Sequence, residues 1–408
     1  MNTEPVLTYI RGNWERSIYH DADGSGFRGM DLPHPYTSPC IKGEGKFSFF
    51  FYWDTYFTNL GLLLDGHAEM AKNNIRNMLW FIERQGYMPN HTAIFNRSQP
   101  PYLCRMVEEY FEARPEEVGS DFFRACCEGL RREYHFWTTA RHTSTGLQGH
   151  GHHDTKEGCI HFYDNFLVRR LGMPVDAPDS DKARIGGHHL AEAESGCDFS
   201  PRFDKRCLDH VSADLNGLLY GYETFLGRHT EALGWDDANL WKDRAESRRE
   251  RVNRYLWDES NDWFMDYDFI NGRPSAVPTL AAMTIPWNGL ATPEQAAGMA
   301  ARLPDFERNH GIAVTPDLPG CRGYQWAYPN VWPPSVWVAV MALQRYGFIE
   351  DAKRIAHKFV AATERLFEKS GQLWEKTDAE TGEVAGGEYE AAPMMGWSAG
   401  IYVALKKI

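Results

Sequence analysis

The arrangement of apolar residues into paired helical stretches constrains the fold of this chain more than any other feature. Between residues 60 and 82, Leu, Met and Ile recur at steps of three and four, and Asp65-Gly66-His67 interrupts the series as a turn. Further periodic stretches cover 208–222 and 239–256, joined through Gly227 and Gly234, then 336–346 and 350–367, then 397–406. Helix pairs separated by long aromatic, Gly- and Pro-rich loops predict an all-α toroid.

Signals for β-structure are sparse. The run from Trp263 to Asp268 is rich in aromatic residues and is followed by Asn271-Gly272, which predicts one short hairpin. Thr292-Pro293-Glu294 combines a capping residue, a proline and an early acid, so a helix is expected to begin there. We find no low-complexity linker and no shift in composition, and therefore expect a single domain over residues 1–408.

The charge balance limits the classes of partner. The chain has 43 Lys and Arg against 56 Asp and Glu, a formal net charge of −13. A negative field of this size repels phosphates, which argues against nucleic acids and anionic membranes. A small neutral or singly acidic molecule remains compatible with it, and so does a homo-oligomer.

Neither a targeting signal nor a disulfide framework is apparent. The first residues, Met1 to Thr8, lack a basic segment followed by an apolar one. The eight cysteines are scattered without a CxxC motif, which fits reduced thiols better than disulfides. We therefore expect a cytoplasmic protein.

Four loop segments mix aromatic rings with carboxylates, amides and arginines, the mixture that carbohydrate sites use. The first runs from Phe49 to Phe57, where Trp53 and Asp54 could wall a pocket and accept hydrogen bonds from sugar hydroxyls. The alternative is a buried aromatic belt in which Asp54 caps the following helix.

The second segment presents polar side chains from a rigid backbone. Asn90 follows a proline, and Arg97 and Gln99 precede Pro100-Pro101, which holds the chain extended. These side chains are candidates for contacts to hydroxyl groups. A structural ion pair is the alternative role for Arg97.

The third and fourth segments supply a pair of carboxylates in different surroundings. Asp198 lies among small and aromatic residues, where loss of hydration raises a carboxyl pKa. Glu375 lies between Trp374 and Lys376, whose charge favours the ionised form. Two such carboxyls are what acid–base glycoside hydrolysis requires. A salt bridge to Lys376 is the plain alternative for Glu375.

The order of the motifs adds a family resemblance that covers most of the chain. From residue 52 to the C-terminus the sequence resembles the trehalase family, glycoside hydrolase family 37, and more loosely family 63. The matching segments are Arg97 to Pro101 for RSQPP, Glu194 to Phe203 for ESGWDFSSRW, Gln325 to Pro334 for QWDYPNGWAP, Glu375 to Asp378 for EKYD, Gly386 to Tyr389 for GGGEY, and Gly396 to Ser398 for GWTNG.

The resemblance implies an (α/α)6 barrel and an inverting α-glycosidase without a metal or other cofactor. It implies that Asp198 is the general acid and Glu375 the general base. The substrate-binding residues that the matching motifs suggest are Trp53, Asp54, Asn90, Arg97, Gln99, Arg169, Gly196, Arg202, Gln325, Trp326, Trp332, Glu388 and Trp397.

Four positions depart from the family pattern. Ser48 and Phe49 stand where the family has Arg and an acid, Cys197 replaces a Trp, and Ala327 replaces an Asp. Arg169 or the neighbouring Arg170 is the counterpart of a further family arginine. Lost donors change which sugar or aglycone a site accepts. A short α-glucoside such as trehalose and a glucosyl- or mannosylglycerate are both candidate substrates.

The His-rich segment from 142 to 154 and the pair His188-His189 leave other interpretations open. Imidazoles at these positions could bind zinc, but an ordered surface loop or a lid that contacts sugar fits a Gly-rich segment better. The rival functions are a sugar isomerase or epimerase that uses His as acid and base, and a non-catalytic sugar-binding protein.

Overall fold

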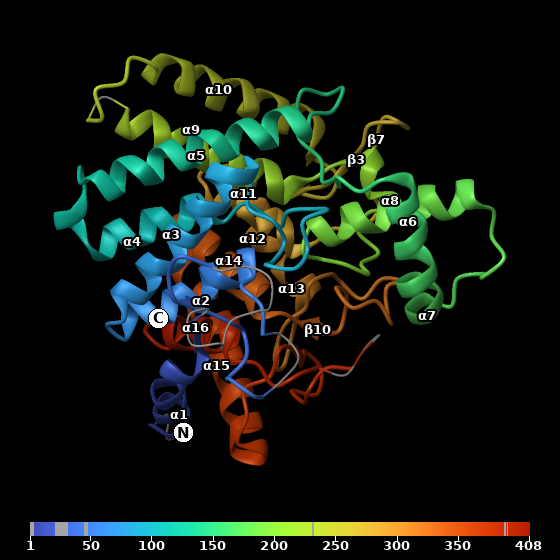
Figure 1. The fold of residues 1–408 in the computed structure, drawn as a ribbon. Helices are drawn as coiled ribbons and strands as arrows, with labels where there is room; N and C mark the ends of the chain where they lie inside the picture. Colours follow the sequence, from blue (N-terminus) through green and yellow to red (C-terminus); the bar gives the residue numbers. More distant parts are fainter. Residues whose placement is uncertain (1–3, 21–31, 45–47, 231, 387–388, 390) are drawn as a thin grey trace.

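Six helices pack side by side in a closed ring in the computed structural model, which describes residues 4–20, 32–44, 48–230, 232–386, 389 and 391–408 (Figure 1). Each helix of the ring contacts the next, and the last contacts the first. In ring order they are α2 (Tyr52–Leu64), α4 (Leu103–Ala113), α9 (Ala213–His229), α11 (Thr284–Trp287), α14 (Pro333–Arg345) and α16 (Gly396–Leu405).

The helices that alternate with these along the chain cover the ring from outside. They are α1 (Glu4–Asn13), α3 (Ala68–Gln85), α5 (Asp121–Ala140), α10 (Ala238–Tyr255), α12 (Pro293–Ala301) and α15 (Ile349–Ser370). Inner helices such as α16 are buried along their whole length, whereas α3, α5 and α15 bury one face. This difference follows from the sequence, since a helix that is apolar all round needs neighbours on every side.

Glycines set the closest approach within the ring. A Cβ on Gly400 of α16 would lie 1.9 Å from the carbonyl oxygen of Phe57 on α2, and one on Gly61 would lie 2.8 Å from the Cα of Gly400. The two backbones can meet only because both positions lack a side chain. The resulting core runs without a break from Val6 to Leu405.

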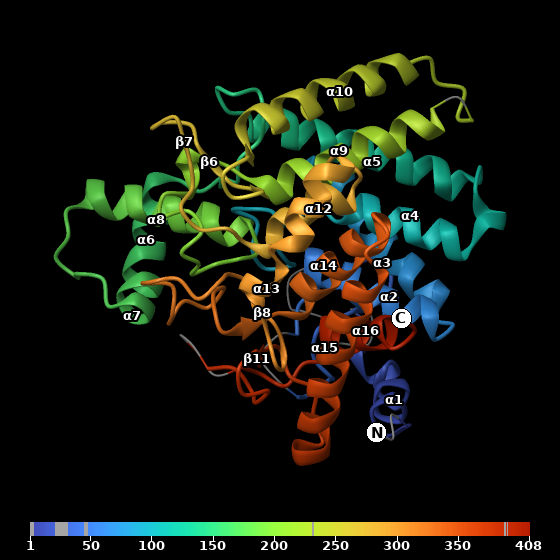
Figure 2. The same cartoon turned by 180° about the vertical axis from the view of Figure 1, so that it is seen from behind.

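A lobe interrupts the alternation between α5 and α9. It contains α6 (Lys156–Phe162), the π-helix η4 (Tyr163–Leu167), α7 (Val168–Leu171) and α8 (Asp179–Glu194), with a small core of its own. Figures 1 and 2 show it at the side of the ring, in green. The remaining helical segments are short: α13 (Leu303–Phe306), η1 (Glu15–Ser17), η3 (Pro115–Glu117), η5 (Cys207–Asp209) and η6 (Leu280–Met283).

The strands are two residues long and pair antiparallel in the loops. The pairs are β1 (Ile18–Tyr19) with β2 (Tyr36–Thr37), β3 (His210–Val211) with β6 (Tyr267–Asp268), β6 with β7 (Arg273–Pro274), β4 (Trp257–Asp258) with β5 (Trp263–Phe264), β8 (Glu307–Arg308) with β9 (Gly311–Ile312), and β10 (Asn330–Val331) with β11 (Thr377–Asp378). The Asn271-Gly272 turn joins β6 to β7, which confirms the predicted hairpin, although Trp263 and Phe264 pair with β4 instead.

Most predicted helices are present, with two corrections. The helix expected from Leu208 begins at Ala213, because His210 and Val211 pair with β6. Gly227 lies inside α9 and not in the following loop, and it faces Trp241 of α10. The helix expected at Thr292 is capped as predicted, with Gln295 completing a capping box.

Within the described residues, no helix combines the length and the apolar character needed to cross a membrane.

Candidate active site

A cavity of about 780 Å³ opens at the end of the ring where the segments preceding the inner helices converge. Trp53 and Asp54 lie in the first turn of α2, and Trp332 is the residue before α14. The loop 90–99 precedes α4 and residues 196–198 precede α9. Glu375, Tyr389, Ala392 and Met394 precede α16, and Trp397 lies in its first turn. The predicted residues that line the cavity are Trp53, Asp54, Asn90, Arg97, Gln99, Arg169, Gly196, Asp198, Trp326, Trp332, Glu375 and Trp397.

Four tryptophans form one wall. The rings of Trp326 and Trp332 are stacked with centroids 3.9 Å apart and planes within 7°. Trp53 lies 5.6 Å from Trp326, and Trp397 lies 5.8 Å from Trp332. The wall therefore offers several ring faces and edges to the C–H groups of a sugar.

Asp198 sits on a strained turn after α8. Phe199, the next residue, has a φ of 58°, and Gly196 has a φ of 73°. Gly196 also cannot carry a side chain, because a Cβ there would lie 2.8 Å from the Trp53 ring. The backbone N–H of Ser200 donates to Glu192 Oε1 over 2.7 Å and holds the turn against α8.

Burial raises the pKa of Asp198, and the charge of Glu192 adds to this effect, while Arg170 and Arg97 oppose it. The carboxyl therefore holds its proton more firmly than an exposed Asp.

Glu375 is buried on the opposite segment, with one oxygen held and one not. Tyr389 donates its hydroxyl hydrogen to Oε1 over 2.7 Å, whereas the buried Oε2 has no hydrogen-bond partner among the described residues. Burial raises the pKa of Glu375 to about 7, against the opposing effects of Tyr389 and Lys376. The carboxyl is thus poised between its two forms near neutral pH.

Asp54 is a third carboxyl in the cavity. It lies within the first turn of α2, and Phe51 is the residue that precedes the helix, so the alternative in which Asp54 caps the helix is wrong. Burial raises the pKa of Asp54 to about 8, and the nearby Glu375 contributes to the rise. At neutral pH this group is mostly protonated and can both donate and accept hydrogen bonds.

Arginines face these carboxyls. Arg170 lies over the rings of Phe199 and Tyr389, 4.5 Å and 5.5 Å from their centroids, and lowers the pKa of Asp198. Arg97 bonds to Asn96 through Nη1, and its buried Nε has no partner among the described residues. Within the described part of the chain Arg97 hydrogen-bonds to the amide of Asn96 and not to a carboxylate, so the alternative of a structural ion pair is not observed, and Arg97 lines the cavity.

No residue of the His-rich segment 142–154 lines the described cavity. The segment instead contacts carboxylates that lie outside the lining. His150 is buried, with Nδ1 3.8 Å from Glu194 and Nε2 3.8 Å from Asp214. The N–H of Gly151 donates to Glu194 over 2.7 Å. The surface-loop and lid interpretations are therefore wrong for residues 147–151, because these residues are buried and His150 lies between two carboxylates. No group of three or more His, Cys, Asp or Glu side chains suited to a metal occurs in the described residues.

Arg202 is not part of the cavity, which corrects its prediction as a sugar contact. Its side chain is 1% exposed. Nε and Nη2 donate to Asp266, and Nη1 and Nη2 donate to Asp214, over 2.6–3.0 Å. Two carboxylates take up four of the five N–H donors of this buried guanidinium and hold it away from the cavity.

Of the two remaining predicted residues, Gln325 lies outside the observed lining and Glu388 lies outside the described residues. Gln325 is buried beside Trp326 but does not line the cavity, and its amide has no hydrogen-bond partner among the described residues. Glu388 lies outside the described residues. Tyr389, its neighbour, lines the cavity instead and was missed, although the matching motif contains it.

The departures from the family pattern separate into two groups. Phe49 lines the cavity and stacks on His91 with centroids 4.5 Å apart. Cys197 and Ala327 are buried and lie outside the lining. Ser48 is half-buried near Phe49. An apolar ring thus takes space at the cavity wall where the family pattern has an acid.

His188 and His189, the pair expected of an isomerase, also lie away from the cavity. His188 Nδ1 accepts from the N–H of Leu208, and His189 Nδ1 lies 2.8 Å from Glu192. Burial lowers the pKa of His188 to about 4. Both residues belong to α8, and their imidazoles connect this helix to Leu208 and, within the helix, to Glu192.

Arg202→Met should lower the melting temperature markedly, since it leaves two buried carboxylates without a counterion, a loss of about 3–5 kcal/mol. Arg97→Met is the matched variant, because Arg97 has no ion pair among the described residues, and it should change stability by less than about 1 kcal/mol. Thermal melts of both variants check this. Equal melting temperatures would show that Arg202 is not a structural group.

Comparison with known proteins gives the family. Residues 20–408 match the family model described as Trehalase. The periplasmic trehalase of Pseudomonas aeruginosa is 31% identical over 409 residues, which cover 93% of this chain and 72% of the relative.

Solved structures agree with this assignment. Neutral trehalase Nth1 from Saccharomyces cerevisiae superposes with a TM-score of 0.79 at 25% identity, over 92% of this chain and 73% of the other. A GH63 mannosylglycerate hydrolase from Thermus thermophilus superposes with a TM-score of 0.66 at 17% identity, over 99% and 100% of the two chains. That last likeness concerns the fold alone.

The closed ring of alternating helices and the structural matches confirm the expected all-α (α/α)6 barrel. With the family model covering nearly the whole sequence, the chain belongs to the trehalase family and is a glycoside hydrolase.

Proposed function

We propose that residues 1–408 form one catalytic domain that hydrolyses a small α-glucoside with inversion, with Asp198 as general acid and Glu375 as general base. The observation that carries the proposal is that both carboxyls line one cavity, with raised pKa values and different partners. Inverting hydrolases place such groups about 6.5–9.5 Å apart, so that a water fits between the base and the sugar. The continuous core supports a single domain.

Asp198 would protonate the oxygen of the leaving group. Burial in a strained turn raises its pKa, as an acid that must be protonated near neutral pH requires. Arg170 and Arg97 are close enough to lower that pKa, and they would stabilise the carboxylate that remains after proton transfer.

Glu375 would take the proton of the attacking water. Tyr389 holds Oε1, so the side chain has one orientation, and Oε2 is left to accept from a water in the cavity. The N–H of the Trp397 ring donates to the backbone oxygen of Glu375 over 3.1 Å, and the N–H of Glu375 donates to the backbone oxygen of Ala392. These bonds fix the base relative to the tryptophan wall.

Trehalose is the first substrate candidate, because the named relatives are trehalases. A glycerate glycoside is the second candidate. Arg97, Arg169 and Arg170 all line the cavity, and three guanidinium groups suit a carboxylate on the aglycone. The Thermus thermophilus structure in complex with D-glycerate makes this aglycone a reasonable one to test.

The rival functions have less support. An isomerase would use imidazoles as acid and base, yet His188 and His189 lie outside the cavity. His91 does line it, but burial lowers its pKa to about 3 and its Nδ1 accepts from the N–H of Ala93. A binding protein without turnover would not need a buried carboxyl poised near pH 7 opposite a second one.

Asp198→Asn and Glu375→Gln should each lower kcat by about 10²–10⁴-fold, since each removes a proton transfer from the reaction. Glu350→Gln, at a side chain that is 89% exposed, is the matched control and should keep full activity. Initial rates on trehalose and on glucosylglycerate measure the effect, with thermal melts to show that the variants are folded.

The stereochemistry of the same reaction tests the mechanism. Inversion of an α-glucoside releases β-glucose first, and proton NMR of the anomeric signals within the first minutes detects it. With trehalose the leaving glucose is released as the α-anomer in either mechanism, so only the glucose at the attacked carbon reports inversion. First products that contain α-glucose and no β-glucose, or full activity of either carboxyl variant on the substrate that the wild type cleaves, would contradict the assignment.

Tyr389→Phe should move the acidic limb of the pH profile of kcat/KM to higher pH. The base acts when ionised, so activity rises with pH through the pKa of Glu375, which is about 7 in the folded protein. The Tyr389 hydroxyl stabilises the carboxylate and lowers this pKa, and removing it raises the pKa. Tyr402→Phe removes a similar bond to Glu364 outside the cavity and should leave the limb in place. A limb that stays unchanged in both variants would remove Glu375 from the role of base.

The proposed location is the cytoplasm. All eight cysteines are free and buried, as thiols in a reducing compartment can remain. The relative from Pseudomonas aeruginosa is periplasmic, which makes the location a point to measure. Fractionation of cells that express the chain from its own gene should find it with cytoplasmic markers, and release by osmotic shock would place it in the periplasm.

A further inference from the structure

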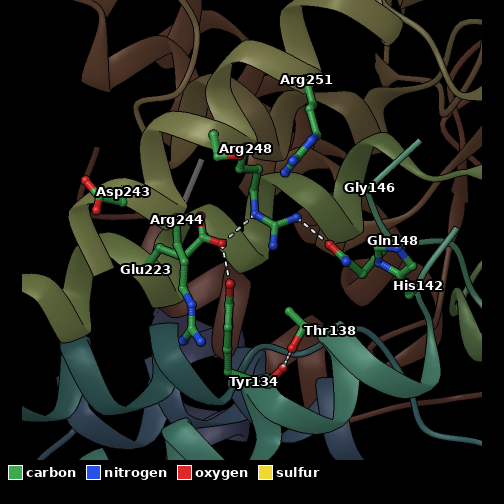
Figure 3. A pocket seen from close by; sticks show the side chains of 11 residues that line it. Tyr134, Thr138, His142, Gly146, Gln148, Glu223, Asp243, Arg244, Arg248 and Arg251 are labelled. Carbon is green, nitrogen blue, oxygen red and sulfur yellow. Dashed lines mark hydrogen bonds and ion pairs between the residues drawn. The ribbon is translucent and has the colours of Figure 1, made fainter. Parts of the chain in front are cut away.

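A second cavity of about 430 Å³ lies on the flank of the barrel, bounded by α5, α9, α10 and the loop 142–148 (Figure 3). It shares no lining residue with the cavity that contains Asp198 and Glu375. Its volume lies within the range of about 300–1,000 Å³ that is usual for small-molecule sites. The side chains that line it are mostly charged or polar, in contrast to the tryptophan wall of the first cavity.

Two buried charges form the floor. Glu223 is 1% exposed and Arg248 is 5% exposed. Glu223 Oε1 accepts from Arg248 Nε over 2.8 Å and from the Tyr134 hydroxyl over 2.6 Å. Glu223 Oε2 is buried and has no hydrogen-bond partner among the described residues. A buried carboxylate oxygen without a donor is costly, so this atom would be stabilised by a hydroxyl group from a ligand.

Arg248 also has unused capacity. Nε bonds to Glu223, and Nη1 bonds to Gln148 and Asn216. Nη2 takes part in none of these three bonds, and Tyr134 also lies close to the guanidinium. The floor thus combines an unpartnered acceptor, Glu223 Oε2, with further donor capacity on Arg248, which matches the dual character of a sugar hydroxyl.

The rim is basic. Arg244, Arg248 and Arg251 follow one another at steps of four and three on α10, so they share one face of the helix. Figure 3 shows the Arg251 guanidinium beside that of Arg248, while Asp243 lies apart at the far edge. Arg244 lies over the rings of Trp241 and Tyr134, 4.8 Å and 5.3 Å from their centroids. Neither the Arg244 nor the Arg251 guanidinium forms an ion pair with a described carboxylate.

This concentration of positive charge stands out in a chain with a net charge of −13. The nearby carboxylates that could neutralise it are Glu223, which is bound to Arg248, and Asp243 at the edge. Guanidinium groups bind phosphate and carboxylate groups through paired N–H donors. The rim is therefore suited to an anionic group, and the floor to hydroxyl groups.

We propose that this second cavity binds a monosaccharide that carries an anionic group, a phosphate or a carboxylate. The anion pairs with the Arg251 guanidinium, which Figure 3 shows beside that of Arg248, and Arg244 adds positive charge from the other side of the Arg248–Glu223 pair. The hydroxyl groups reach Glu223 Oε2 and Arg248 Nη2 at the floor.

Isothermal titration with glucose 6-phosphate, gluconate, glucose and inorganic phosphate tests the proposal. The two sugar anions, or one of them, should bind at least about tenfold more tightly than glucose or phosphate, since only they engage both rim and floor. The preferred anion distinguishes a phosphate from a carboxylate as the natural group. Binding of phosphate as tight as that of both sugar anions, or no binding of either sugar anion, would overturn the proposal.

Variants locate the site. Arg244→Ala combined with Arg251→Ala should weaken binding of the sugar anion by at least about tenfold, because it removes the rim cations. Arg254→Ala, an exposed arginine of the same helix outside the cavity, should not change it. Asp198→Asn should also retain binding, since the first cavity is not involved. Hydrogen exchange of residues 142–148 should slow with ligand in the wild type. Binding lost in Asp198→Asn but kept in the double arginine variant would place the ligand in the first cavity and refute the proposal.

Discussion

A buried series of alternating charges holds the active-site loops of this barrel in place. Arg141 binds Glu194, His150 lies between Glu194 and Asp214, and Arg202 binds both Asp214 and Asp266. Burial by itself lowers the pKa of His150, but Asp214 and Glu194 raise it above its ordinary value. A protonated His150 makes the series electrically neutral, which is the condition under which so many buried charges are tolerated.

The series matters because each member comes from a different part of the chain. Glu194 ends α8, four residues before Asp198, and it accepts from the N–H of Ser98 in the segment that carries Arg97 and Gln99. Asp214 lies in the first turn of α9. The backbone positions of Asp198 and Arg97 are thereby connected through Glu194, which does not line the cavity. This is the support that a precisely placed acid requires.

The contrast between the structural and the cavity carboxyls explains how one protein maintains both. Arg141 and His150 hold the pKa of Glu194 well below its ordinary range despite burial, and Arg202 does the same for Asp214. Asp54 and Glu375 are also buried, but neither is bound to an arginine or a histidine among the described residues, and their pKa values rise to about 8 and 7. A buried carboxyl that is bound to a counterion stays ionised, whereas a buried carboxyl without one has a raised pKa and can gain or lose its proton near neutral pH.

Features set by neighbouring residues could be predicted from the sequence, whereas contacts between distant segments could not. Helical periodicity locates the helices well, and the motifs place Trp53, Asp198 and Glu375 at one cavity, because these features are local. Arg202 was misassigned because its motif does not show that Asp214 and Asp266, the latter 64 residues away, saturate it. Glu223 and Arg248 were not predicted because their pairing exists only when α9 and α10 pack together.

The segment 142–151 contacts groups at both cavities. Gln148 accepts from Arg248 at the second cavity, and His150 lies between Glu194 and Asp214 behind the first. Gln148 and His150 lie two residues apart in a buried stretch, so one short part of the chain contributes both to the second cavity and to the charges behind the first, which its Gly- and His-rich composition does not reveal.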